Sequence, residues 1–353
     1  MQVNPLPNLR RLKPGAEENQ ALLGRGLTAT NFRNNERVRI LLKQIVRQQI
    51  HLWVNGKTVL RSFIRPFRSG CRAPASPARR NLSPLGSEES IFNLQLGCMP
   101  YLSNLYYQGY QADDPNRWPL ALIHGAGGDH LSWPSQLRRL SGYRVYTPDL
   151  PGHGKSKGRG LQGIASYAEA AAAWLQDLAL PKVFLAGHSM GGAIALWLGL
   201  NHPELVRALI LISTGATLPV NLSLIEELAT QVGFPTAVDK ITSWSFSSRV
   251  EPGLVENVKR QMLTTRPSVL AGDFRACDRF DLSHRLAEIQ MPTLVLVGDE
   301  DKMTPERFAE ELAEGIPGAE LNVIRGAGHM LPLEQPDEVA RVVRGFLVRV
   351  LAS

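Results

Sequence analysis

The sequence predicts an α/β protein with a doubly wound, mainly parallel sheet. Strand-like apolar runs alternate with helix-like segments from about residue 105 to the end of the chain. Such alternation places helices on both faces of a parallel sheet. Between residues 212 and 291 the alternation stops, and we interpret residues 217–290 as an inserted helical cap. The sheet domain is then formed by residues 99–216 and 291–353, and residues 1–98 precede it as a basic extension.

Seven apolar runs are predicted as strands, and four segments as the helices between them. The predicted strands are Leu105–Tyr110, Leu120–Ile123, Arg144–Thr147, Lys182–Ala186, Ala208–Ile212, Thr293–Val297 and Leu321–Ile324. The predicted helices are Ser166–Ala179, Met190–Asn201, Pro305–Gly315 and Pro336–Leu351. Ser166 and Glu169 have capping-box spacing, and Thr304 before Pro305 is typical of an N-cap. In the cap, helix-like pieces span Leu222–Val232, Pro235–Trp244 and Pro252–Thr264.

Residues 183–192 carry the most informative motif of the chain. The apolar run from Val183 continues into Gly-His-Ser-Met-Gly, and a helix-compatible run follows. A serine between glycines is most often an ordinary turn residue. Between a strand and a helix, however, this pattern is typical of a nucleophile elbow, whose serine adopts an unfavourable backbone conformation. The context predicts that the Ser189 hydroxyl is exposed at a helix N-terminus, where the helix dipole favours negative charge.

A serine hydroxyl alone is a weak nucleophile, so this hypothesis requires a base, an orienting acid and an oxyanion hole. The strand-like run from Thr293 ends in Gly-Asp-Glu-Asp, which puts Asp299 and Asp301 on the following loop. The next run leads into a glycine-rich loop with His329, and an upstream run leads into His-Gly-Ala-Gly-Gly from His124. The order Ser, Asp, His along the chain is the one in which an elbow serine meets its partners.

With these motifs the chain resembles the α/β-hydrolase superfamily, over roughly residues 100–353. The segments Asp149–Ser156 and His202–Val206 are also similar to loops of that family. The resemblance implies the following site: nucleophile Ser189, acid Asp301, base His329, and an oxyanion hole made by the backbone amides of Ala126 and Met190. Asp301 is preferred to Asp299 because the acid in related sequences usually falls third after the glycine that ends the strand.

The activity that the resemblance implies is hydrolysis of a carboxylic ester of a small apolar molecule through an acyl-enzyme intermediate. Lactonase, thioesterase and C–C bond hydrolase chemistry remain open, as does a non-hydrolytic small-molecule receptor. Serine at position 189 argues against dehalogenases and most epoxide hydrolases of this fold, which have aspartate there. Gly-His-Ser at the elbow, in place of Gly-Asn-Ser, argues against C–C bond hydrolases without excluding them.

Other polar residues receive structural interpretations. We expect His124 and His153 to hold loops together and His188 to support packing. No pair of histidines has metal-ligand spacing, so we expect neither a metal nor a cofactor. Apolar cap residues should mostly form the cap core, with one or two facing the substrate: Leu218, Phe234, Trp244, Phe246, Met262 and Phe274. Asp278 and Asp281 are weak candidates for polar contacts.

The basic charge of the chain is confined to its first quarter. Residues 1–98 hold 16 of the 39 Lys and Arg but only 5 of the 32 Asp and Glu. The remainder is mildly acidic and gives no reason to expect a nucleic-acid partner. Within the extension, residues 37–54 can form one basic amphipathic helix, and Ile91–Leu96 can add a strand. Three interpretations stay open: a membrane-surface or nucleic-acid-binding appendage, a poorly ordered extension, and a biological start at Met99.

Composition favours a cytoplasmic enzyme. The three cysteines are widely spaced and odd in number, which is not a disulfide framework. No apolar run approaches the roughly 18 residues of a membrane span, and the N-terminus lacks the apolar core of a secretory signal. The sequence leaves the oligomeric state and the identity of the substrate open.

Overall fold

The computed structural model describes residues 53–54, 57–58 and 101–353, and the chain divides into two units, Met1–Pro84 and Leu85–Ser353. In the first unit, β1 (Trp53–Val54) pairs antiparallel with β2 (Lys57–Thr58). The helix predicted over 37–54 is therefore wrong at its last two residues. The sequence Asn-Gly at 55–56 is a strong hairpin signal that overrides the helical pattern there. Residues 37–52, Ile91–Leu96 and Met99 lie outside the described residues.

The second unit is built on a sheet of eight strands in the order β10-β9-β8-β7-β5-β6-β4-β3. The strands from β10 to β6 run parallel, while β4 pairs antiparallel with β6 and β3 antiparallel with β4. The strands are β3 (Tyr101–Leu102), β4 (Leu105–Tyr110), β5 (Trp118–Ile123), β6 (Tyr143–Pro148), β7 (Val183–His188), β8 (Val206–Ile212), β9 (Thr293–Gly298) and β10 (Glu320–Ile324). The seven predicted strands are confirmed, and the short β3 is an addition.

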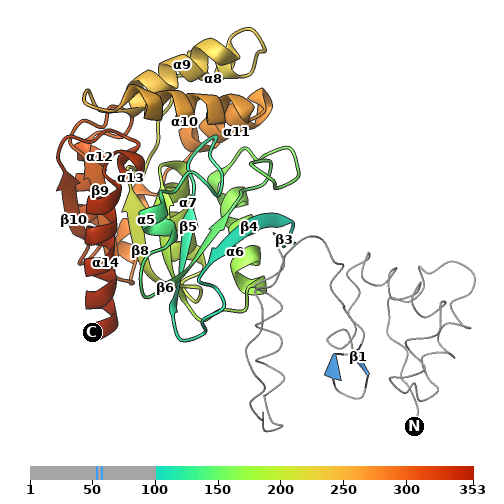
Figure 1. Ribbon diagram of the computed structural model, residues 1–353, viewed down its shortest axis with the longest axis vertical. Helices are drawn as coiled ribbons and strands as arrows, with labels where there is room; N and C mark the ends of the chain where they lie inside the picture. The colour runs from blue at the N-terminus through green and yellow to red at the C-terminus, as the bar shows by residue number, and fades with distance from the viewer. Residues whose placement is uncertain (1–52, 55–56, 59–100) are drawn as a thin grey trace, which may run out of the picture. The chain divides into compact units, whose positions relative to one another are not determined.

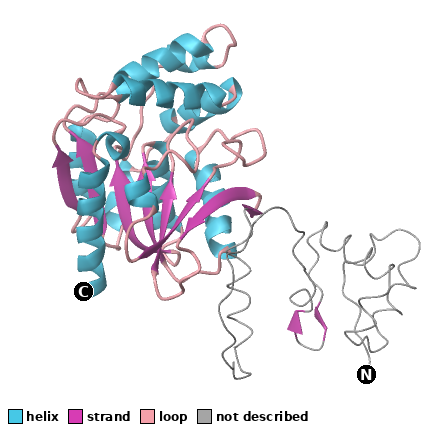
Figure 2. Cartoon of the chain, in the orientation of Figure 1, coloured by secondary structure: helices cyan, strands magenta, loops and turns pink. Residues whose placement is uncertain are grey.

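Helices cover both faces of the sheet, as Figure 2 shows. They are α5 (Ser135–Arg138), α6 (Ile164–Asp177), α7 (Met190–Asn201), α12 (Glu306–Gly315), α13 (Leu331–Glu334) and α14 (Pro336–Ala352). One core cluster joins α6, α7 and α12 to Ala121 and Ile123 of β5, and the other joins α5 and α14 to Leu120 and Leu122. Alternate residues of a strand point to opposite faces, so this β-strand contributes to both cores. The doubly wound architecture is confirmed.

Two predicted helix starts are wrong. The helix α6 begins at Ile164 after an extended Gly163, so Ser166 lies inside the first turn and makes no capping box. Its buried stripe begins with Ile164 and Tyr167, which lie one turn apart, and burial of Ile164 favours a helix start before Ser166. The helix α12 begins at Glu306 with Pro305 as its N-cap, and the Thr304 hydroxyl donates instead to Asp301.

The insertion between β8 and β9 is helical. It contains α8 (Leu222–Leu228), α9 (Phe234–Ser245), α10 (Pro252–Thr264) and α11 (Pro267–Asp278), followed by the 3-10 helix η3 (Ser283–Glu288). The four α-helices share a hydrophobic cluster of their own and lie together over the sheet domain in Figure 1. A bridge between Thr217 and Asp281 joins the two ends of the insertion. The helix α11 was not among the predicted pieces.

Among the described helices, none is long and apolar enough to span a membrane.

Candidate active site

The turn between β7 and α7 holds Ser189 in a strained conformation. Its φ of 54° and ψ of −120° lie in a region that non-glycine residues rarely adopt. A side chain at Gly187 would overlap the backbone of Gly191, and one at Gly191 would overlap the Ile123 carbonyl. The Ser189 amide donates to the Ile212 carbonyl at 2.9 Å, which fixes the turn to β8. These contacts are those of a nucleophile elbow.

Asp301 and His329 meet beyond the ends of β9 and β10. The His329 Nδ1 lies 3.0 Å from one carboxylate oxygen of Asp301 and 3.2 Å from the other, and both side chains are buried. Burial raises the pKa of Asp301, but the charge of His329 and hydrogen bonds from His329 and Thr304 outweigh it and hold the pKa below its usual value. The aspartate is therefore an ionised acceptor that fixes the orientation of the imidazole. Asp299, the alternative acid, accepts from the Gly326 amide instead.

Thr304 is a site residue that the sequence interpretation assigned to helix capping. Its hydroxyl donates to Asp301 Oδ2 at 2.8 Å and lies 3.2 Å from His329 Nδ1. The amides of Thr304 and Met303 donate to the other carboxylate oxygen of Asp301, at 2.8 and 2.9 Å. The turn after Asp301 thus surrounds the carboxylate with donors. The Asp-x-x-Thr spacing is the signal that could have identified it.

The loop after β5 carries Ala126, whose amide is the predicted oxyanion donor, and Ala126 lines the same pocket as Ser189. The peptide that carries this amide also carries the Gly125 carbonyl, which lies 2.8 Å from His124 Nδ1 and accepts from the Gly128 amide at 3.1 Å. The orientation of the peptide is therefore fixed from its carbonyl side. Met190 is the first residue of α7, so its amide precedes the hydrogen-bond ladder of the helix.

His188 and His124 are neutral, buried donors that hold the loops of the site. The His188 Nε2 donates to the backbone carbonyl of His329 at 2.8 Å, and burial together with the charge of His329 lowers the pKa of His188 to about 3. Burial and the neighbouring His153 lower the pKa of His124 to about 4, and its Nε2 accepts from the Leu150 amide at 3.0 Å. Both residues fit the structural interpretation given from sequence, and His188 has a more specific task than packing.

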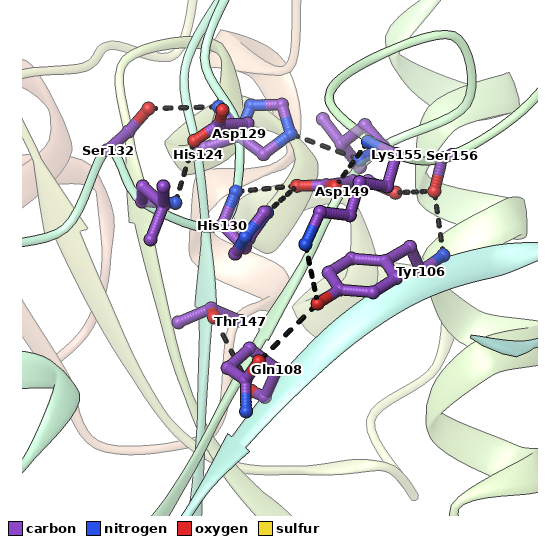
Figure 3. Close-up of polar contacts among 12 residues, drawn as sticks. Tyr106, Gln108, His124, Asp129, His130, Ser132, Thr147, Asp149, Lys155 and Ser156 are labelled. Atoms are coloured by element: carbon purple, nitrogen blue, oxygen red, sulfur yellow. Dashed lines mark hydrogen bonds and ion pairs between the residues drawn. The ribbon is translucent and has the colours of Figure 1, made fainter. Parts of the chain in front are cut away.

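Asp149 ties the loop after β6 to the loop after β5, as Figure 3 shows. Its Oδ1 accepts from the amide and the Nδ1 of His130, at 2.6 and 2.8 Å, and its Oδ2 accepts from the Lys155 amide at 2.7 Å. Ligand-type atoms of Asp129, His130 and Asp149 lie within 4.8 Å of one another. Because these hydrogen bonds occupy both oxygens of the buried carboxylate, we assign the cluster to loop structure and not to a cation.

A pocket between the sheet domain and the cap contains both Ser189 and His329. Its lining residues are Gly125, Ala126, Gly127, Gly128, Ser132, His188, Ser189, Leu218, Pro219, Val220, Ile241, Ser245, Val258, Gln261, Met262, Phe274, Cys277, Met303, Thr304, Phe308, His329, Met330 and Leu333. Among these described residues there is no lysine, arginine, aspartate or glutamate. Three of the cap residues named from sequence contact the pocket, namely Leu218, Met262 and Phe274. Asp278 and Asp281 accept instead from nearby backbone amides.

Comparisons with known proteins agree with this architecture. A 2-hydroxymuconate semialdehyde hydrolase of Pseudomonas putida is 28% identical over 271 residues, 70% of this chain and 91% of that protein. A pimeloyl-(acyl-carrier protein) methyl ester esterase of Neisseria meningitidis is 30% identical over 249 residues, 65% of this chain and 77% of that protein. The structure of a thermophilic esterase from Thermogutta terrifontis is 29% identical with a TM-score of 0.63, and the match covers 70% of this chain and 93% of that one.

A family model also matches the chain directly. The model of the alpha/beta hydrolase fold matches residues 119–336, which extend from β5 through the cap to the first residue of α14. This region is more than half of the chain and includes the elbow, the acid and the histidine. The protein belongs to the alpha/beta hydrolase family.

Proposed function

We propose that this protein is a serine hydrolase that cleaves an uncharged, apolar carboxylic ester through an acyl-enzyme. The observation that carries the proposal is the pocket, in which Ser189 and His329 lie among apolar cap and core residues. Transfer of a charged group into such a pocket without a partner is strongly unfavourable, whereas an apolar acyl or alcohol group gains from burial.

The proposed reaction begins when His329 takes the proton of the Ser189 hydroxyl. The serine oxygen attacks the ester carbonyl, and the backbone amides of Ala126 and Met190 donate to the resulting oxyanion. Collapse of this intermediate breaks the carbon–oxygen bond of the ester, and the leaving alcohol takes the proton from the imidazolium. Water, deprotonated by the same imidazole, then attacks the acyl-serine. The bond between the acyl carbon and the serine oxygen breaks, the imidazolium returns its proton to that oxygen, and the acid is released. The ionised Asp301 stabilises the imidazolium in both halves of the reaction.

Two kinds of relative bear on the choice of substrate. One relative is a pimeloyl-(acyl-carrier protein) methyl ester esterase, and another is a 2-hydroxymuconate semialdehyde hydrolase, whose named substrate is a carboxylate. Among the described residues that line the pocket there is no lysine or arginine to pair with such a carboxylate. This lining supports a neutral ester over the acidic substrate of the second relative.

The test is hydrolysis of p-nitrophenyl esters of increasing acyl length by the wild type, Ser189→Ala and Ser223→Ala. Removal of a nucleophilic serine costs about 10⁶-fold in kcat in a well-studied serine hydrolase, so Ser189→Ala should have no measurable turnover. Ser223 is an exposed cap serine bonded only to Asn221, and its variant should retain full activity. The acyl length with the highest kcat/KM will report the depth of the pocket.

A second panel distinguishes the alternatives. Neutral lactones and thioesters of the best acyl length, together with 2-hydroxymuconate semialdehyde, are offered to the same three proteins. Faster turnover of the acidic compound than of every neutral ester would overturn the assignment of an uncharged substrate. Turnover that survives in Ser189→Ala would overturn the serine mechanism itself.

A further inference from the structure

The cap holds the residue next to the proposed oxyanion donor by both of its backbone groups. The Gly127 amide donates to Asp273 Oδ2 at 3.0 Å, and the Gly127 carbonyl accepts from the Thr265 hydroxyl at 3.2 Å. Asp273 lies on α11, and Thr265 is the C-cap residue that follows α10. Two cap side chains therefore fix one residue of a core loop, between Ala126 and Gly128.

Asp273 is a fully buried carboxylate whose partners all come from the sheet domain. Its Oδ2 also lies 2.8 Å from His153 Nε2, and its Oδ1 accepts from the Tyr167 hydroxyl at 2.6 Å. The other ring nitrogen of His153 lies 3.2 Å from the Pro151 carbonyl, so both nitrogens face acceptors. An imidazole in that position carries both protons, and the resulting cation balances the buried carboxylate.

The protonation of His153 agrees with its surroundings. Burial lowers the pKa of His153, but the charge of Asp273 and its hydrogen bond outweigh the effect of burial and raise the pKa above its usual value. The cation faces the acidic groups Asp273 and Asp149, and the neutral ring of His124 packs beside it with centroids 5.0 Å apart. His153 and Tyr167 thus orient the carboxylate of Asp273 before any substrate arrives.

These contacts are more specific than cap attachment requires. Apolar contact already joins the cap to the loop, because a side chain at Gly127 would meet Leu270 and Met262. The polar contacts also fix the orientation of the backbone, since they set the positions of the N–H and the C=O on either side of the Gly127 α-carbon. Oxyanion donors lose their effect when they are misplaced by a fraction of an ångström to about one ångström.

We propose that Asp273 and Thr265 are positioning residues, through which the docked cap holds the Ala126 amide where the oxyanion forms. This inference rests on the proposed serine hydrolase function. Neither residue touches the substrate in this scheme. The oxyanion hole is then complete only when the end of α10 and the middle of α11 are docked on the loop, so cap docking and transition-state stabilisation are coupled.

The test compares Thr265→Val with Thr265→Ser and Thr264→Val. Valine keeps the shape of Thr265 and removes its hydroxyl, whereas serine keeps the hydroxyl. Thr264 is the matched control, because its exposed hydroxyl donates to the Gln261 carbonyl of its own helix. Loss of one whole oxyanion donor costs about 10²–10³ in kcat, so a displaced donor in Thr265→Val should cost about 10-fold, with KM changed by less than about 2-fold. Thr265→Ser and Thr264→Val should match the wild type.

The decisive readout is a pair of inhibitors with the preferred acyl chain. A trifluoromethyl ketone forms a bond from its carbonyl carbon to the Ser189 oxygen and places the resulting oxyanion in the hole. The matching methyl ketone binds without that charge. In Thr265→Val the inhibition constant of the trifluoromethyl ketone should rise by the same factor as kcat falls, and that of the methyl ketone should stay unchanged. Asp273→Asn should show the same split with a larger factor, measured below its unfolding temperature.

The outcomes separate the two proposals. If the folded wild type neither hydrolyses esters nor binds the trifluoromethyl ketone more tightly than the methyl ketone, the serine hydrolase function and this inference both fail. If the wild type is active and Thr265→Val equals it in kcat and in both inhibition constants, only the positioning role fails. An equal rise of both inhibition constants would show that Thr265 shapes the pocket and does not position the oxyanion donor.

Discussion

Replacement of Thr304 by valine should show how much the hydroxyl that donates to Asp301 contributes to stability and to catalysis. Asp301 accepts from His329 and from three groups of the turn that follows it, and the Thr304 hydroxyl is one of these at 2.8 Å. A hydrogen bond to a charged group contributes about 1.5–3 kcal/mol. We expect Thr304→Val to lose about 2 kcal/mol of unfolding free energy at pH 7 and about 10-fold in kcat. Thr304→Ser, which keeps the hydroxyl, should lose far less of both.

The pH dependence of the lost unfolding free energy shows whether the Thr304 hydroxyl stabilises Asp301 or His329. The pKa of Asp301 is lowered in the folded state, so its stabilisation is fully present above the unfolded carboxyl pKa of about 4 and is lost as the pH falls through the folded value. The variant should therefore have the same deficit at pH 7 and at pH 5, and the deficit should shrink only below about pH 4. Urea unfolding at each pH measures it. A deficit that vanishes between pH 7 and pH 5 would refute the reasoning, because the hydroxyl would then act through His329.

Two further predictions concern the buried groups around the site. His188→Phe should lower kcat about 10-fold by freeing the loop of His329. Because the folded pKa of His188 is about 3, below its usual value, the unfolded state takes up a proton as the pH falls through about 6.5. The wild type should then lose about 1 kcal/mol more unfolding free energy than His188→Phe between pH 7.5 and pH 5.5, and an equal loss would contradict this. Asp149→Asn should cost about 3 kcal/mol of unfolding free energy, since three donors face its carboxylate. Lys240→Ala, which removes a surface ion pair with Glu227, should cost at most about 1 kcal/mol, and a similar loss in both variants would count against the buried network.

The strands β5, β7, β8 and β9 were predictable because each contains a continuous apolar run with a glycine at its end or in the loop that follows. The elbow, Asp301 and His329 sit on such loops, and the structure brings Asp301 and His329 into contact with the geometry that the motif order suggests. The edge strand β3 has only two residues, too few to produce a periodic signal. Two predicted helix starts were wrong. At Ser166 burial of the preceding Ile164 favoured an earlier start, and at Thr304 the hydroxyl donates to Asp301 instead of capping the helix.

The cap was harder to predict because several of its residues contact partners that are far away in the sequence. Asp273 lies on α11, which was not predicted, and its partners Gly127, His153 and Tyr167 are more than 100 residues upstream. A single sequence contains no periodicity that links such positions. For the same reason the pocket residues Val258 and Gln261 could be recognised only from the folded chain.

The insertion of the cap between β8 and β9 has a consequence for how such a protein can be altered. Ser189 precedes the insertion, and Asp301 and His329 follow it, so the cap contributes no proposed catalytic side chain. Exchange of the whole cap with that of a relative could therefore change the shape of the pocket and leave these three residues in place. One condition is the Gly127 contact, where a donor cap must supply a carboxylate and a hydroxyl at the positions of Asp273 and Thr265. A second condition is the contact of the cap with the loop of His329, where the Ser245 carbonyl accepts from the Met330 amide.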